Sequence, residues 1–410
     1  MRIVEAEIIP IYPRLVARNT AHNAHFPNWN VRTVFRLKAD NGLTGYGDYR
    51  CPPPPRSAVE PLLGRSPFDF LNNDFNPGLG GALYDLMGKY LELPAYKLMG
   101  QKLRGAIPVA AWTKPASPEK LRQEVKRAVA EGYTTMKMHS AEYYDILAQH
   151  QAVLESAPPE FRMHYDFNHN RSLATVLPLL RELEQGRAVA CVEDPLRPND
   201  VEGWRLLRRQ LRLPIVMHPT PLGGLHEIHL DMADAYMLGG QIGSTLRRGG
   251  ALAAANTAAV VQLTGGTLTK ALAMHLSAVL PAPVLHTVDL DDQYAEDITT
   301  ERLPVIDGRT PVPEGPGLGP EVDEAALARL AAREPTPVPK HVAALHLRDG
   351  HTLYFRSLME AQEGGVQRMT GQEEGAVRGL QLELWDDDGS DAFAQVYQRV
   401  HQQGPYLEAK

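Results

Sequence analysis

The chain has 410 residues, more than a single hydrophobic core usually holds, so we expect two or more domains. Hydrophobic residues make up 43% and charged residues 22%, which is typical of a globular protein and excludes a disordered chain. The formal net charge of −7, with no long basic run to offset it, argues against nucleic acid and anionic membrane surfaces as partners.

Two features predict a cytoplasmic protein. The two cysteines, Cys51 and Cys191, are too few for a disulfide framework or a cysteine metal cluster. The opening MRIVEAEIIP lacks the apolar core of a signal peptide, and no apolar run is long enough to span a bilayer.

Residues 1–106 differ in pattern from the rest of the chain. MRIVEAEIIPIYPRLV and VRTVFRLKADNGLTGYGDY read as strands, and a turn at Asn41-Gly42 breaks the second stretch. A polar, aromatic loop lies between them, and helical segments come next, ending in GALYDLMGKYLELPAYKLMG. We therefore predict an α+β domain here.

Residues 107–300 alternate short apolar strands with helical stretches. Eight strands are expected, in VAAW, TTMKMH, RMHYDFN, AVACVED, PIVMH, DAYMLG, AVVQLT and VLHTVD. This rhythm indicates βαβ units and a parallel sheet, and eight strands favour a closed barrel. An open doubly wound sheet is the alternative, but no G-x-G-x-x-G follows the first strand to support a nucleotide site.

Beyond the predicted barrel, residues 301–337 hold a Pro/Gly-rich passage and a short helix. Residues 338–410 alternate strand-like pieces with polar turns and finish in a helical segment around DAFAQVYQRVHQ. We predict a return segment over 301–337 and an appended β-rich element over 338–410.

Polar residues recur where successive barrel strands end. In TTMKMHS, Lys137 and His139 lie two positions apart, so their side chains point the same way along a strand. Roughly one βα repeat separates each further member of the series: Asp166 with Asn168, then Glu193, then His218. In a barrel these positions converge on the mouth where active sites lie.

Carboxylates on neighbouring strands predict a divalent-cation site. Oxygen ligands favour Mg²⁺ or Mn²⁺, whereas His218 as a ligand would shift the preference toward Mn²⁺, Zn²⁺ or a similar ion. A single Asp after a strand is more often a helix cap, and Lys137 could merely extend to the surface. Two acids on adjacent strands beside Lys-x-His outweigh that reading.

Several motifs together resemble the enolase superfamily, in its mandelate racemase/muconate lactonizing enzyme branch. They are NGLTGYGDYR, ALYDLMGKYLELPAYKLMGQKLRGAIPVAAW, DFNHN, CVEDPL and VPEGPGLGPEVDE, and they cover roughly residues 1–335. The resemblance implies a modified TIM barrel, (β/α)₇β, with an N-terminal α+β capping domain. It also implies removal of a proton next to a carboxylate, with a divalent metal such as Mg²⁺ stabilising the enediolate.

The resemblance implies roles for individual residues, although this sequence departs from the family pattern at several positions. Lys137 and His139 stand for the catalytic Lys-x-Lys strand, and Asp166 and Glu193 match the first two metal ligands. The third ligand is normally an acid, and only His218 is available there. Elsewhere Asp48 replaces a glutamate and Gly239 replaces a lysine or aspartate on the opposite face of the substrate, while residues 338–410 have no counterpart.

The expected function is a lyase or isomerase acting on a small carboxylate substrate. Because the second face lacks a base, dehydration or cycloisomerisation is favoured over two-base racemisation. The alternative is a non-catalytic member that binds a small molecule or a protein partner. The resemblance also implies a homo-oligomer. The expected substrate-binding residues are Asn168, His22, His25, Trp29, Arg50 and the weakly matching Asp-x-Asp pair, Asp289 and Asp291.

Overall fold

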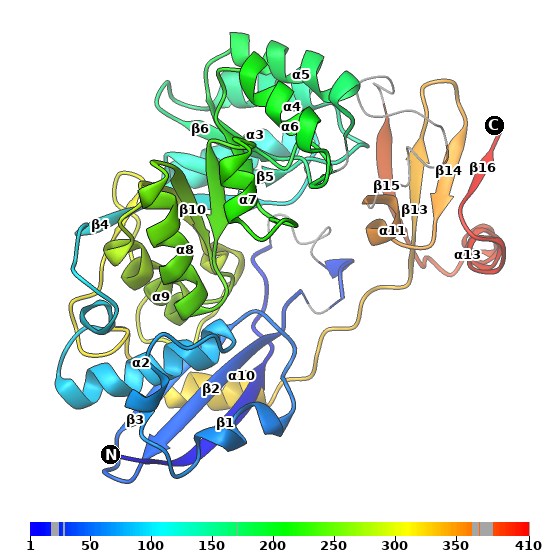
Figure 1. The fold of residues 1–410 in the computed structure, drawn as a ribbon. Coiled ribbons are helices and arrows are strands. Elements are labelled where there is room, and N and C mark those ends of the chain that lie inside the picture. Colours follow the sequence, from blue (N-terminus) through cyan, green and yellow to red (C-terminus); the bar gives the residue numbers. More distant parts are fainter. Residues whose placement is uncertain (18–23, 28, 170, 363–368, 370–379, 410) are drawn as a thin grey trace.

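The computed structural model describes residues 1–410 except 18–23, 28, 170, 363–368, 370–379 and 410. The chain builds a central barrel, with one small sheet formed by the N-terminal part of the sequence and another by the C-terminal part (Figure 1). Among the described residues, no helix combines the length and the apolar character needed to cross a membrane.

The N-terminal unit is an antiparallel sheet covered by a helix: β1 (Ile3–Ile11), β2 (Arg32–Ala39), β3 (Thr44–Tyr49) and α2 (Pro77–Leu91). Two glycines of the NGLTGYGDY hairpin explain how closely α2 approaches β3. A Cβ atom on Gly45 would lie 2.4 Å from the carbonyl oxygen of Ala82, and one on Gly47 would lie 2.1 Å from that of Gly78. The helix packs directly on the strand backbone because both positions lack a side chain.

The central sheet is a closed parallel barrel of eight strands. They are β4 (Ala106–Thr113), β5 (Thr135–His139), β6 (Arg162–Asp166), β7 (Val189–Glu193), β8 (Ile215–Met217), β9 (Ala235–Leu238), β10 (Ala258–Gln262) and β11 (Val284–Val288). Each strand pairs with the next, and β11 pairs with β4 to close the ring. All eight predicted strands are confirmed, as is the barrel class.

Helices connect successive barrel strands and surround them (Figure 1). They are α3 (Pro118–Ala130), α4 (Ile146–Ser156), α5 (Leu173–Gln185), α6 (Val201–Gln210), α7 (Leu225–His229), α8 (Ile242–Ala254) and α9 (Thr267–Val279). Local sequence sets where several begin: Ser117 caps α3 just before a proline, and the Asp145 carboxylate accepts a hydrogen bond from the Leu147 amide at the start of α4. Every residue of α9 is buried, since this helix lies between the barrel and the N-terminal sheet.

The chain returns to the N-terminal sheet after the last barrel strand. β12 (Arg309–Pro311) pairs antiparallel with β4, and α10 (Glu324–Ala331) lies against β1 (Figure 1).

The C-terminal residues form the predicted β-rich element. Its sheet has the order β15-β13-β14-β16 and is antiparallel throughout. The elements are β13 (His341–His346), β14 (Thr352–Phe355), α11 (Leu358–Gln362), β15 (Gln381–Asp386), α13 (Asp391–Gln403) and β16 (Tyr406–Glu408). Its inner face shares an apolar cluster with the β5–α4 loop, in which Ala141 and Tyr143 pack with Leu345 and Phe355. This element therefore borders the C-terminal end of β5, where the candidate site begins.

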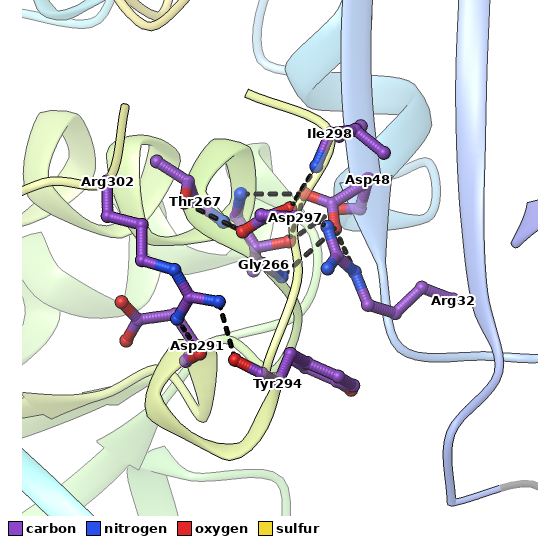
Figure 2. A network of polar contacts seen from close by, with 10 residues as sticks. Arg32, Asp48, Gly266, Thr267, Asp291, Tyr294, Asp297, Ile298 and Arg302 are labelled. Atoms are coloured by element: carbon purple, nitrogen blue, oxygen red, sulfur yellow. Dashed lines mark hydrogen bonds and ion pairs between the residues drawn. The ribbon is translucent and has the colours of Figure 1, made fainter. Parts of the chain in front are cut away.

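A buried ionic network joins the N-terminal sheet to the barrel (Figure 2). Arg32 on β2 donates to Asp48 on β3 at 2.7 Å and pairs with Asp297 at 2.7 Å. Asp48 also accepts hydrogen bonds from the amides of Gly266 and Thr269, each at 3.0 Å, at the start of α9. The aspartate that departs from the family pattern thus anchors the cap to a barrel helix.

Candidate active site at the barrel mouth

Lys137 lies at the centre of the strand-end cluster. Its ammonium nitrogen is 3.0 Å from Asp166 Oδ2, 2.7 Å from Glu193 Oε2 and 3.1 Å from Gln262 Oε1. Asp166 and Glu193 lie opposite each other in the parallel register of β6 and β7. The sequence prediction that these three charged residues lie together agrees with their placement, and Lys137 is fully buried among them.

The opposite charges in this cluster keep one another ionised. Burial lowers the pKa of Lys137, but Asp166 and Glu193 outweigh burial and hold it above its ordinary value. Burial raises the pKa of Glu193, and the Lys137 charge together with His164 and His218 outweighs it, so that the pKa lies well below its ordinary value. Lys137 is therefore protonated and Glu193 ionised at neutral pH.

His139 lies beside this ion pair at the end of β5. Its Nε2 is 3.3 Å from Asp166 Oδ2, and its ring meets the edge of Trp112 at a centroid distance of 5.4 Å. Burial lowers the pKa of His139 to about 4, with the nearby Lys137 charge acting in the same direction and Asp166 opposing it. The imidazole is therefore neutral near pH 7 and has a lone pair with which to accept a proton.

The donor set at the end of β7 and β8 fits a divalent cation. Glu193, Asp194 and His218 each offer a ligand atom, and these atoms lie within 4.8 Å of one another. His218 Nδ1 is 3.3 Å from Glu193 Oε1, a buried oxygen that accepts no hydrogen bond from the described residues. A buried carboxylate oxygen without a donor, with an imidazole nitrogen facing it, is suited to share a cation.

Unusual backbone geometry positions two side chains here. Asn168 and Asp194 adopt positive φ angles of 51° and 48°. The backbone N–H of Asn168 donates to Asp166 Oδ1, and the Asp194 carboxylate accepts from the backbone N–H of His218, both at 2.9 Å. Burial raises the pKa of Asp194 to about 6, with neighbouring Glu193 adding to the rise and a hydrogen bond from His169 opposing it. We did not predict Asp194 as a site residue, because only the left-handed turn brings it beside His218.

An aromatic and cationic group covers the other side of His139. Trp29 stacks on Trp112 at 5.3 Å, and the Arg50 guanidinium lies 4.5 Å above the Trp29 ring. Lys114 is buried 4.1 Å from the same ring, and burial together with the Arg50 charge lowers its pKa to about 7. Two of the predicted substrate residues, Trp29 and Arg50, are thus placed together near the mouth.

Lys114 was not predicted as a site residue. It follows β4 directly, so it occupies the strand-end position of the first barrel strand. The rule that identified Lys137, Asp166 and Glu193 would have identified it if applied to the first strand.

A cavity of about 320 Å³ opens at the ends of β9 and β10, beside Arg50 and His218. Arg50, His218, Gly239 and Gln262 line it. A Cβ atom on Gly239 would lie 2.0 Å from the Gln262 carbonyl oxygen, so the backbone excludes any side chain at this strand end. Gln262 itself supplies no acid or base group and instead accepts a hydrogen bond from Lys137.

Other predicted substrate residues have partners elsewhere. His25 Nε2 lies 2.6 Å from Asp386 Oδ1 on β15, and its ring meets that of His341 on β13. Asp291 pairs with Lys270 at 3.1 Å, and Asp289 accepts a hydrogen bond from the Thr287 hydroxyl at 2.7 Å. His22 lies outside the described residues.

Curated relatives include sugar-acid dehydratases. A D-gluconate dehydratase of Thermoproteus tenax is 26% identical over 332 residues, which cover 69% of this chain and 65% of the relative. A D-galactonate dehydratase of Pectobacterium atrosepticum is 24% identical over 286 residues, covering 63% of this chain and 74% of the relative. The match therefore spans slightly less than two thirds of the length of the first of these relatives.

Solved structures share the fold at lower identity. The 3,6-anhydro-D-galactonate cycloisomerase of Zobellia galactanivorans aligns with a TM-score of 0.64 and 20% identity, covering 80% of this chain and 99% of that one. The 2-chloromuconate cycloisomerase of Rhodococcus opacus aligns with a TM-score of 0.67 and 18% identity, covering 82% and 100%. The family model "Enolase C-terminal domain-like" matches residues 120–326, half of the chain. With the barrel and these matches in place, the chain belongs to the enolase C-terminal domain-like family.

Proposed function

We propose that the protein is a divalent-metal-dependent dehydratase of a sugar acid. The observation that carries this proposal is the mouth cluster, in which Lys137 bridges Asp166 and Glu193 with a neutral His139 beside them. The dehydratase activities of the relatives support the substrate class, because a sugar acid carries both a carboxylate and a hydroxyl that can leave from the carbon beyond the α-carbon. Cycloisomerisation of such an acid is the neighbouring reaction and begins with the same proton removal.

The proposed cation is Mg²⁺ or Mn²⁺, held by the converging donors Glu193, Asp194 and His218, with Asp166, which the resemblance implies as a ligand, on the adjacent strand. When bound, such an ion stabilises the negative charge that the substrate carboxylate gains as its α-proton leaves. The mixed oxygen and imidazole donors leave Mn²⁺ a stronger candidate here than in an all-carboxylate site.

The chain's own residues then divide the proton transfers. His139, which is neutral near pH 7, accepts the proton from the α-carbon. The carbon–oxygen bond at the next carbon breaks, and Lys114, with a pKa of about 7, gives its proton to the departing hydroxyl, which leaves as water. The remaining enol rearranges to a 2-keto-3-deoxy acid. Arg50 binds the anionic substrate, because its buried Nε has no hydrogen-bond partner among the described residues.

The opposite face of the cavity favours elimination over racemisation. Racemisation needs a proton acceptor on each face of the α-carbon. Gly239 has no room for a side chain, and Gln262 cannot exchange protons near neutral pH. A one-base reaction is therefore the chemistry that these residues support.

A screen of aldonates tests the proposal. Purified protein with Mg²⁺ or Mn²⁺ is incubated with D-gluconate, D-galactonate and their stereoisomers in D₂O, and NMR follows exchange of the α-proton and formation of the 2-keto-3-deoxy acid. His139→Asn should reduce the rate by about 10²–10⁴-fold, the usual contribution of a general base. His226→Asn, on the exposed surface of α7, is the matched control and should retain the parent rate.

The outcomes separate the two readings of the sequence. Product formation that survives His139→Asn would contradict the assignment of the base. Cation binding by calorimetry without exchange or product from any aldonate would favour the non-catalytic member that binds a ligand. Assembly into a homo-oligomer stays a prediction, which light scattering on the same preparation would check.

A further inference from the structure

A second group of metal-ligating side chains lies deeper in the barrel. His164, Cys191 and His286 project inward from β6, β7 and β11, and their exposed fractions are 0%, 1% and 3%. His164 and Cys191 each lie two residues before a mouth carboxylate, so they occupy the next inward-facing layer below Asp166 and Glu193. The parallel register places His164 directly opposite Cys191.

The three side chains converge on one point. Each offers one ligand atom, and these atoms lie within 4.8 Å of one another. His164 Nδ1 and His286 Nε2 are 2.9 Å apart. Around Cys191 the barrel interior is otherwise apolar, with Ala110, Val216, Ala235, Met237, Val260 and Val288. Barrel interiors are usually filled by bulky apolar residues, so two imidazoles and a thiol in one layer suggest a specific function.

Hydrogen bonding accounts for only part of this arrangement. His164 Nδ1 hydrogen-bonds His286 Nε2, and His164 Nε2 lies 2.7 Å from Glu193 Oε2 without hydrogen-bonding geometry. Among the described residues, only Nδ1 of His164 therefore has a hydrogen-bond partner, and the buried Nε2 has none. The hydrogen bond between the two imidazoles gives no role to the thiol of Cys191, which is a weak hydrogen-bond donor.

We propose that His164 Nδ1, His286 Nε2 and Cys191 Sγ form a binding site for a zinc-class cation. Zinc binds imidazole nitrogen at about 2.0–2.1 Å and thiolate sulfur at about 2.3 Å in tetrahedral geometry, so two ligand atoms on one zinc lie about 3.3–3.6 Å apart. The two imidazole nitrogens, now 2.9 Å apart, would separate by a few tenths of an ångström, and the Cys191 sulfur, which lies within 4.8 Å of them, would approach by up to about 1 Å. Binding converts the Cys191 thiol to a thiolate, with its proton released to solvent.

The surroundings of His164 show which of its nitrogens faces the cluster. Its Nδ1 faces His286, whereas its Nε2 lies 2.7 Å from Glu193 Oε2 and has no hydrogen-bond partner among the described residues. Histidines that bind metals usually have a carboxylate at their second ring nitrogen, and Glu193 lies where such a carboxylate would be.

The chemistry of this site differs from that of the mouth. Two imidazoles and a thiolate select a borderline or soft ion, whereas the mouth carboxylates select a hard one. Glu193 belongs to both surroundings, because one carboxylate oxygen faces His164 and Lys137 while the other faces His218. The core site therefore needs an ion that the proposed dehydratase reaction does not use.

Cobalt titration tests the site without any assay of activity. The full chain is freed of metal with a chelator and titrated with Co²⁺, which gives a thiolate-to-cobalt charge-transfer band when cysteine coordinates it. We expect one such band at one equivalent and its loss on adding Zn²⁺. Cys191→Ser should abolish the band, whereas Cys51→Ser, which alters the other cysteine, should retain it.

Histidine variants and X-ray absorption complete the test. His286→Gln should weaken cobalt binding by about tenfold or more, whereas His275→Gln, at a buried histidine on α9, should not. X-ray absorption on the zinc-loaded parent should show one sulfur and two imidazole nitrogens, and this measurement holds even if a variant fails to fold. A parent protein with no thiolate band, or a zinc spectrum without sulfur, would overturn the proposal.

Discussion

Replacing Asp48 with asparagine should loosen the junction between the N-terminal sheet and the barrel. The Asp48 Oδ2 atom accepts from Arg32 Nε and the Gly266 amide, and Oδ1 accepts from the amide and hydroxyl of Thr269. The asparagine side chain would have one accepting oxygen and one NH₂ group. An NH₂ group at the Oδ2 position would face Arg32 Nε and the Gly266 amide, and one at the Oδ1 position would face the Thr269 amide, since the Thr269 hydroxyl can donate to the Asp48 carbonyl instead.

The expected loss of stability can be worked out from these contacts. Hydrogen bonds to a charged group contribute about 1.5–3 kcal/mol each, and breaking a buried ion pair costs about 3–5 kcal/mol. Both figures describe the loss of the same Asp48 contacts, so they are not added together. Because Arg32 keeps Asp297 as an ion-pair partner, we expect the free energy of unfolding to fall by no more than about 3–5 kcal/mol. At an unfolding entropy of about 2.1 cal/mol/K per residue, a chain of 410 residues should lose about 4–6 °C in Tm.

Differential scanning calorimetry measures this shift. The matched control is Asp74→Asn, since Asp74 also joins the N-terminal region to α8, through the Ser244 amide at 2.7 Å and Arg247 at 2.6 Å, but in an exposed position. We expect the control to melt with the parent, because solvent screens the exposed pair. An Asp48→Asn protein that melts within about 1 °C of the parent would refute the view that this network holds the cap on the barrel.

Three further substitutions test the mouth. Gly239→Ala should lower Tm by several degrees and reduce soluble yield, because the new Cβ would meet the Gln262 carbonyl oxygen at 2.0 Å; an unchanged melting curve would show that the strand end can shift. Lys137→Met should raise the affinity for Mn²⁺ in calorimetry, because the ammonium that now lies between the two carboxylates competes with a cation, and weaker binding would contradict this. Lys114→Met should flatten the rise of stability with pH. In the parent the folded Lys114 loses its proton near pH 7, while the unfolded residue keeps it to about pH 10.4, so the unfolded state binds the extra proton and the free energy of unfolding increases between these values. Urea unfolding at about pH 6 and about pH 9 measures the slope, and equal slopes in variant and parent would reject the lowered pKa.

The sequence predicted the barrel well, because its signals are local. Each strand is a short apolar run followed by a helical stretch, and such units allow few arrangements. The strand-end rule likewise located Lys137, Asp166 and Glu193, since parallel strands of a barrel all end at one mouth. These predictions needed only the order of elements along the chain.

The remaining site features depend on contacts that no local pattern encodes. Asp194 reaches the cation donors through its left-handed backbone, and that conformation is not evident from the letters CVEDPL. His25 meets Asp386, a residue at the far end of the chain, so its partner could not be inferred from the cap loop. The lowered pKa of Lys114 results from burial beside Trp29 and Arg50, which come from two different loops of the cap. Tertiary packing determines the position of Asp194, the partner of His25 and the pKa of Lys114.

The apolar cluster shared by the β5–α4 loop and the C-terminal sheet has a consequence for the order of folding. Ala141 and Tyr143 immediately follow the strand that carries Lys137 and His139, yet their packing partners on β13 and β14 are synthesised much later. Barrel strands can pair while the chain is still emerging, but this loop lacks its apolar cover until β13 and β14 have formed. In a nascent chain that stops before β13, Tyr143 therefore lacks the apolar partners that bury it in the folded protein.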